Sequence, residues 1–311
     1  MQAHHLSSGD LIADRRAGYA RMLADASDFA AAAELMEQAL ELAPDWAAGW
    51  FLLGEYREKA GLSGDATQAF ARVLELVKED IFGASLKLAV LGERSQPDQP
   101  PVAYVEQLFD DYAGHFEEAL VEKLDYKVPG RLATLIFAHT GEQLGHVVDL
   151  GCGTGLLGVE LRGRTSALEG CDLSANMLAK AAEKGIYSHL TQADLSLGPN
   201  EPRLISAEWP AGRAEVVAAA DVLMYLGDLT PVFKLAHTLL RAGRLFAFSV
   251  EALQADDGYR LQGSLRYAHG RSYIEALLKE TGFELQASEE LVIRMDAGAP
   301  INGFLFLARK R

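Results

Sequence analysis

Cysteine is scarce in this 311-residue sequence, which contains only Cys152 and Cys171. Two cysteines cannot build a disulfide framework, and alone they do not make a zinc site. No cluster of His, Asp and Glu has the spacing of a metal site either. We therefore predict that the protein binds no metal.

Long apolar runs are also missing. No run of about 18 apolar residues occurs, so no segment is expected to span a membrane. The opening MQAHHLSSGD lacks the apolar core of a secretory signal. We therefore expect a cytoplasmic protein.

Basic residues are outnumbered, since 29 Lys and Arg face 44 Asp and Glu, for a formal net charge of -15. A protein this acidic is repelled by phosphate backbones and by anionic membrane surfaces. Neither nucleic acid nor a membrane is expected as a partner. Hydrophobic residues, in contrast, make up 49% of the chain, enough for a globular core. The length suits one large domain and one small domain.

The first 92 residues contain a repeat in a region rich in Ala, Leu and Glu. Residues 39–42 (ALEL) recur 34 residues later as VLEL, a period typical of tetratricopeptide repeats. The same offset relates three further pairs: Ala20 and Gly54, Ala32 and Ala66, and Met36 and Phe70. We predict an all-α tetratricopeptide-like domain over residues 1–92, closed by a helix over 80–92. Its role is open between a groove for a peptide or protein and a structural or dimerising appendage.

The amino-acid composition changes after the repeats. Residues 93–101 (ERSQPDQPP) are polar and contain three prolines, which indicates a linker. Beyond them, Tyr104, Leu108, Tyr112 and Phe116 recur every four residues, the pattern of one helix face. A second helix is expected over residues 130–140.

From residue 146 onward, strand and helix patterns alternate. Strands are expected at residues 146–150, 167–171, 187–192, 214–220 and 244–250, followed by an antiparallel pair at 283–294 and 303–308. A helix over 174–184 begins with a serine cap. Such βα alternation predicts a mostly parallel sheet with helices on both faces.

A glycine-rich loop follows the first of these strands. Residues 149–155 read DLGCGTG, and glycine permits both a positive φ and a close approach of the backbone to a ligand. Asp149 precedes the first glycine by two residues, and Asp172 ends the next strand. A carboxylate at that place suits the hydroxyls of a ribose. The even spacing of Gly151, Gly153 and Gly155 disfavours an NAD-dependent oxidoreductase, whose loop is usually Gly-x-Gly-x-x-Gly.

DLGCGTG, then CDLS (171–174) and ADL (193–195), resemble class I S-adenosylmethionine-dependent methyltransferases. FDDYAGHF (109–116), AADVLMYLGD (219–228), FSVE (248–251) and RYAH (266–269) extend the resemblance to a bacterial group fused to N-terminal tetratricopeptide repeats. The resemblance implies a Rossmann-like seven-stranded sheet, mostly parallel, with an antiparallel last strand. It places the methyltransferase domain at residues 102–311, with lid helices at its start.

The resemblance also implies a set of contacts to the cofactor, S-adenosylmethionine. The loop residues Gly151 and Gly153 would meet its amino-acid part, with Cys152 as a small residue in the turn. Asp149 would bind its amino group and Asp172 its ribose. The adenine contacts implied are Leu173, Met177, Asp194 and Leu195.

Ligands of an open α/β sheet bind beyond the carboxyl ends of the strands, which selects a second group of residues. Asp221 and Tyr225 follow the fourth strand, and Glu251 follows the fifth. Tyr225 either closes over the methyl group or packs in the core, and Glu251 is either a catalytic carboxylate or half of a salt bridge. His269, expected in the next loop, is either a general base or a helix cap. Asp221 and Tyr112 are further candidates for cofactor contact.

The predicted function is transfer of a methyl group to a nucleophile by in-line displacement, in which positioning supplies most of the catalysis. A small-molecule substrate is favoured. Residues 221–224 read DVLM instead of the Asn/Asp-Pro-Pro-Tyr expected of an enzyme that methylates DNA bases. Two alternatives are a protein methyltransferase and a repeat-based binding scaffold with a cofactor site. The repeats also suggest a protein partner or self-association.

Overall fold

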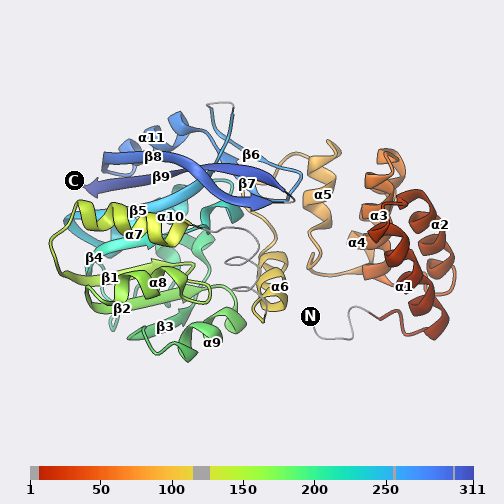
Figure 1. The fold of residues 1–311 in the computed structure, drawn as a ribbon, viewed down its shortest axis with the longest axis horizontal. Coiled ribbons are helices and arrows are strands. Elements are labelled where there is room, and N and C mark those ends of the chain that lie inside the picture. Colours follow the sequence, from red (N-terminus) through yellow and green to blue (C-terminus); the bar gives the residue numbers. More distant parts are fainter. Residues whose placement is uncertain (1–6, 115–126, 255–256, 297) are drawn as a thin grey trace. The chain divides into compact units, whose positions relative to one another are not determined.

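The computed structural model describes residues 7–114, 127–254, 257–296 and 298–311 (Figure 1). The chain divides into two compact units. The first, which we call the helical unit, ends at Gln107 and also includes Gly263–Leu265; the rest forms the α/β unit. The division falls inside a helix rather than in the proline-containing stretch 93–101.

Antiparallel helices joined by short turns build the helical unit. They are α1 (Leu11–Asp25), α2 (Phe29–Leu40), α3 (Ala47–Lys59), α4 (Ser63–Leu76), α5 (Ala84–Val90) and the first half of α6 (Val102–Tyr112). The carboxylates of Asp10 and Asp28 accept backbone hydrogen bonds at the starts of α1 and α2, which is how an N-cap stabilises a helix. Each of α1 to α4 packs on the next helix in the chain, and α5 confirms the expected closing helix.

Positions that are 34 residues apart are core positions in both copies of the repeat. Met36 and Phe70 are both fully buried, as are the small residues Ala32 and Ala66. A Cβ atom added to Gly54 would lie 2.5 Å from Cε1 of Phe70, so the glycine makes room for the ring. The helical region is thus confirmed, while its assignment to the tetratricopeptide family stays a prediction.

The variant Gly54→Ala is expected to lower the free energy of unfolding by about 1–3 kcal/mol, because the added methyl group overpacks the core against Phe70. In the first copy, Ala20 and Met36 stand at the corresponding positions. We therefore expect Phe70→Met to relieve the defect, so that the two changes couple favourably by about 1 kcal/mol in a double-mutant cycle. Urea unfolding of the four proteins measures this coupling, and strictly additive effects would contradict the repeat equivalence.

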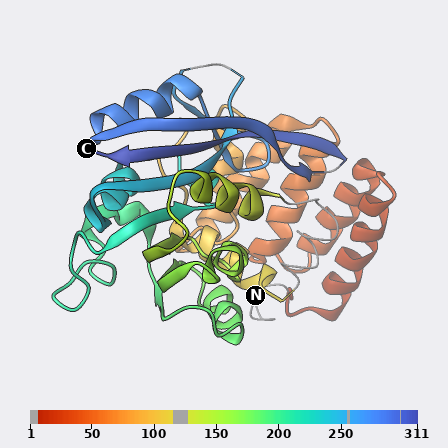
Figure 2. The same cartoon turned by 60° about the vertical axis from the view of Figure 1, so that its left-hand side comes forward.

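A single mixed sheet forms the centre of the α/β unit. Its strands are β1 (Leu144–Leu150), β2 (Thr165–Asp172), β3 (His189–Gln192), β4 (Ala214–Ala219), β5 (Leu240–Ala252), β6 (Tyr259–Leu261), β7 (Tyr267–His269), β8 (Phe283–Asp296) and β9 (Ala299–Lys310). The order β3-β2-β1-β4-β5 is parallel throughout. β9 pairs antiparallel with β5 and with β8, which confirms the antiparallel last strand. The long β8–β9 ribbon is clear in Figure 2.

The described residues contain nine strands, so the prediction of seven was wrong. The two additional strands, β6 and β7, pair with each other, and β7 extends the end of β5 through Glu251 and Ala268. Three-residue strands are too short to produce an alternating pattern that can be recognised in a sequence. This is why they were missed.

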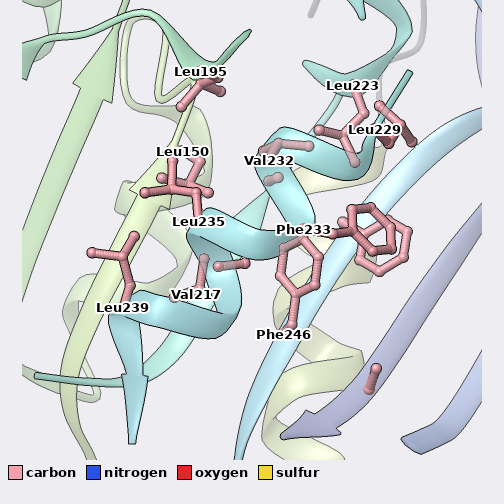
Figure 3. Close-up of a cluster of buried hydrophobic side chains, with 14 of the residues drawn as sticks. Leu150, Leu195, Val217, Leu223, Leu229, Val232, Phe233, Leu235, Leu239 and Phe246 are labelled. Atoms are coloured by element: carbon pink, nitrogen blue, oxygen red, sulfur yellow. The ribbon is translucent and has the colours of Figure 1, made fainter. Parts of the chain in front are cut away.

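Helices cover both faces of the sheet. They are α7 (Val128–Ala138), α8 (Leu156–Arg162), α9 (Ala175–Glu183), α10 (Thr230–Leu239) and α11 (Arg271–Glu280), with short 3-10 helices η3 (Leu195–Asn200) and η4 (Leu223–Tyr225). Val147 and Val148 of β1 are both buried but belong to opposite cores, as expected of a parallel strand covered on both sides. In one core, Phe233 of α10 packs on Phe246 of β5 (Figure 3). No helix in the described ranges is long and apolar enough to span a membrane.

Candidate active site

The glycine-rich loop leaves β1 at its carboxyl end. Gly151, Gly153 and Gly155 all have positive φ, at 65°, 54° and 91°, which confirms the reason for expecting glycine there. At Gly151 a Cβ atom would also collide with the side chain of Val222. The Cys152 N–H donates to the Cys171 carbonyl at 2.9 Å, so the loop is fastened to β2. Its shape excludes side chains where a ligand would meet the backbone.

Asp172 lies beside this loop, because β2 is the neighbour of β1 in the sheet. Its carboxylate accepts hydrogen bonds from the N–H groups of Gly153 and Ser174, both at 2.9 Å. Burial raises the pKa of Asp172 to about 6, although these bonds lower it. A carboxylate has about four acceptor positions, and the Leu173 N–H also contributes, so at least one position remains for a ligand hydroxyl. This donor and acceptor set fits a ribose next to a glycine-lined loop.

Asp149 is almost entirely buried, with 1% of its surface exposed. The Tyr187 hydroxyl donates to its Oδ2 atom at 2.7 Å. Burial raises the pKa of Asp149 to about 7, and the bond from Tyr187 opposes that shift. Sequence reasoning missed Tyr187, which it placed in a strand; β3 begins two residues later.

The residues predicted for the adenine follow β2 and β3. Leu173 is half-buried and Leu195 is buried, while Met177 is fully enclosed on the inner face of α9. Asp194 caps η3 by accepting from the Ser196 N–H at 2.9 Å. The buried Glu201, which the sequence did not suggest, accepts from the Asp194 N–H at 3.1 Å. It holds the segment around Asp194 in place.

The second half of α6 contacts both sides of this region. The Asp110 carboxylate accepts from the Ser174 hydroxyl at 2.5 Å, next to Asp172. The Phe109 ring meets Tyr225 edge-on, with centroids 4.8 Å apart. Tyr112 ends the helix and is 38% exposed. The other predicted lid residue, Phe116, lies outside the described residues.

Beyond β4 and β5 lies a buried network of ion pairs. Arg294, near the carboxyl end of β8, donates to both carboxylate oxygens of Asp221 at 3.1 and 3.2 Å, and also to Glu251. The Asp221 N–H donates to Ser249 Oγ at 2.7 Å. Asp221 has a φ of +56°, a strained conformation of the kind that collects at functional sites. The salt-bridge alternative for Glu251 is therefore what its contacts favour.

Arg266 joins the same network. It lies 3.8 Å from Glu251 and 3.1 Å from Asp296. Sequence reasoning missed both Arg266 and Arg294. A charged residue in the otherwise apolar stretch VIRM (292–295) was the available signal for Arg294, since β8 runs in the same direction as β5.

His269 lies in strand β7, so its placement in a loop was wrong. The side chain is fully buried, and its Nε2 atom is 3.0 and 3.1 Å from the carbonyl oxygens of Leu226 and Gly227. Burial lowers the pKa of His269 to about 4. The neutral imidazole donates through Nε2 to these carbonyl groups, while its Nδ1 atom is buried without a hydrogen-bond partner among the described residues. The geometry favours a structural residue that fixes the segment after η4.

The predicted residues therefore gather along one edge of the sheet. Gly153 of the loop donates to Asp172, and Tyr187 donates to Asp149. Asp221 and Glu251 share Arg294. In the described part of the chain, no group of three His, Cys, Asp or Glu residues is arranged to hold a metal ion.

Comparison with known proteins supplies the family. A family model described as a methyltransferase domain matches residues 120–288. Malonyl-acyl-carrier-protein O-methyltransferase from Salmonella typhimurium is 27% identical over 110 residues, which is 35% of this chain and 40% of that protein. The match thus spans less than half the length of this curated relative.

Two solved structures share the fold. The 1,6-didemethyltoxoflavin-N1-methyltransferase of Burkholderia thailandensis, with 1,6-didemethyltoxoflavin and S-adenosylhomocysteine bound, is 17% identical and has a TM-score of 0.52, over 70% of this chain and 93% of that one. The 4+2 cyclase SpnF is 16% identical, with a TM-score of 0.53, over 69% and 97%. Such identities establish the fold alone, and the cyclase illustrates that one fold hosts different reactions.

Proposed function

The chain belongs to the methyltransferase-domain family, and we propose that it transfers a methyl group from S-adenosylmethionine to a small molecule. The observation that carries the proposal is the contact between the glycine loop and Asp172, through the 2.9 Å bond from the Gly153 N–H. It sets an acceptor for a ribose beside a loop whose backbone a ligand can approach closely.

We assign the cofactor contacts as follows. Asp172 holds the ribose, and Asp149 receives the amino group. The backbone of the loop meets the amino-acid part, and the segments after β2 and β3 enclose the adenine. The residues in these last two roles are Gly151, Cys152, Gly153, Leu173, Met177, Asp194 and Leu195.

S-adenosylmethionine supplies an activated methyl group when bound, so the chain's own residues chiefly position the acceptor. Asp221 and Tyr225 after β4 and Glu251 in β5 form the wall on the substrate side, and Arg294 fixes the two carboxylates. Asp221 and Glu251 are engaged in ion pairs, and burial lowers the pKa of His269 to about 4, so none of the three is both unpaired and strongly basic. We therefore propose an acceptor atom that carries an available lone pair at neutral pH.

A second candidate is a methyltransferase that acts on a protein. It is favoured by a hollow of about 810 Å³ in the helical unit. The apolar part of its lining includes Trp46, Ile81 and Phe82. A segment of a protein substrate, or of a second copy of the chain, would dock there.

A fractionated extract distinguishes the two candidates. Ultrafiltration separates small molecules from proteins, and each fraction is incubated with the enzyme and S-adenosylmethionine while formation of S-adenosylhomocysteine is followed. We expect turnover with the small-molecule fraction and none with Asp172→Asn. Turnover supported by the protein fraction alone would replace the proposal with the second candidate.

A further inference from the structure

Tyr187 lies beneath the cofactor loop, between α9 and β3. Its hydroxyl reaches Asp149 Oδ2 at 2.7 Å, and Asp149 is itself 1% exposed. A buried carboxylate is stabilised by each hydrogen bond that it accepts. Tyr187 provides such a bond from a part of the chain 38 residues away.

The ring of Tyr187 fills a space left by three glycines. A Cβ atom at Gly155 would lie 2.9 Å from Cε2 of the ring, and one at Gly170 would lie 2.8 Å from Cε1. A Cβ atom at Gly158 would collide with the hydroxyl oxygen. The three glycines belong to the loop, to β2 and to α8, so backbone from three separate elements closes around one side chain. This arrangement leaves the hydroxyl little freedom to point anywhere but toward Asp149.

We propose that Tyr187 is a positioning residue for the cofactor. Its ring forms the floor of the glycine loop, and its hydroxyl holds the Asp149 carboxylate in the orientation that receives the cofactor's amino group. This inference rests on the proposed function, because it requires that Asp149 binds that amino group.

The titratable groups that face Asp149 are Tyr187, Asp172 on β2, and the thiol of Cys152. Burial raises the pKa of the Cys152 thiol, and of the Cys171 thiol behind it, so both stay neutral near pH 7. Burial raises the pKa of Asp149 to about 7, the Tyr187 bond lowers it, and the charge of Asp172 raises it. Loss of the hydroxyl therefore moves the pKa of Asp149 further upward.

The test is the pH dependence of binding of S-adenosylhomocysteine, measured by calorimetry between about pH 6 and about pH 8.5. The variant Tyr187→Phe keeps the ring and removes only the hydroxyl. We expect it to weaken binding about tenfold near neutral pH, the value of one hydrogen bond to a charged group. The loss should shrink as the pH rises, because Asp149 is then ionised in both proteins and only the orienting contribution of the hydroxyl is lost. Asp172 and the ligand's own amino group titrate in both proteins, so they cancel in the ratio of the two dissociation constants.

Asp149→Asn is the matched control, and it should bind S-adenosylhomocysteine weakly. The dissociation constants of Asp149→Asn and Tyr187→Phe should become equal at low pH. Affinity in Tyr187→Phe equal to that of the unmodified protein at every pH would overturn the inference. Failure of the unmodified protein to bind the ligand would count against the proposed function instead. Circular dichroism of each variant establishes that the fold is retained.

Discussion

Asp172→Asn is expected to weaken binding of S-adenosylhomocysteine by about 100-fold. The carboxylate orients the N–H groups of Gly153 and Ser174 and retains acceptor capacity for the ribose. Hydrogen bonds to a charged group contribute about 1.5–3 kcal/mol each, and a loss of about 3 kcal/mol is roughly a factor of 100 in affinity. The amide keeps the size of the side chain but offers one oxygen in place of two and adds an unwanted donor.

Glu215→Gln is the matched control for this prediction. Glu215 lies at the start of β4 and pairs with Arg241 and Arg244, at the opposite end of the strands from the cofactor loop. The variant Glu215→Gln loses the same charge as Asp172→Asn, and it should bind S-adenosylhomocysteine as tightly as the unmodified protein does. Calorimetric titration of the three proteins gives the dissociation constants, and equal affinity in Asp172→Asn would remove the ribose role from this residue.

Arg294→Met is expected to lower the free energy of unfolding of the α/β unit by about 3–5 kcal/mol, because it removes the cation that is hydrogen-bonded to the buried carboxylates of Asp221 and Glu251 and leaves only the more distant Arg266. Only 3% of the Arg294 side chain is exposed, and it separates Asp221 from Glu251. The comparison is Arg131→Met, which breaks the exposed pair with Glu289 and should cost under about 1 kcal/mol. Thermal or urea unfolding of both variants measures the difference.

The sign of the pH dependence provides a second check. Burial already raises the pKa of Asp221 to about 6 with Arg294 in place, and removal of the guanidinium raises it further. The folded variant then binds a proton that the unfolded chain, with a carboxyl pKa of about 4, does not hold. The free energy of unfolding of Arg294→Met should rise as the pH falls toward about 4, so that its difference from the unmodified protein becomes smaller. Adding Asp221→Asn should recover part of the loss at neutral pH, and a deficit that stays constant with pH would contradict the charge explanation.

The cofactor side of the site could be predicted from the sequence because its determinants are local. Gly151, Gly153 and Gly155 follow β1 directly, and the torsions that require glycine are set within that turn. Asp172 is near them because consecutive parallel strands are usually neighbours in a sheet. Residues that are close in the sequence, such as the loop glycines and Asp172, are therefore also close in space.

The substrate side could be predicted only in part, since it depends on long-range packing. Arg294 lies 73 residues beyond Asp221, and it reaches that carboxylate only because β9 enters the sheet between β5 and β8. His269 was assigned to a loop because β7 has three residues. No pattern in the sequence indicates that three separate glycines leave room for the ring of Tyr187.

The helical unit shows the same division. Its period could be predicted from the sequence because buried positions such as Met36 and Phe70 recur 34 residues apart. The ligand of its hollow could not be predicted, because recognition depends on the shape that several helices form together and on the surface of the partner. The repeat therefore predicts helices without predicting their ligand.

Calorimetric titration of the unmodified protein with S-adenosylhomocysteine, beside a titration with NAD, tests the central claim most directly. We predict binding of one S-adenosylhomocysteine per chain with a dissociation constant on the order of micromolar, and no heat of binding from NAD. Binding of NAD without binding of S-adenosylhomocysteine would contradict the account, because the evenly spaced glycines and Asp172 would then serve a dinucleotide.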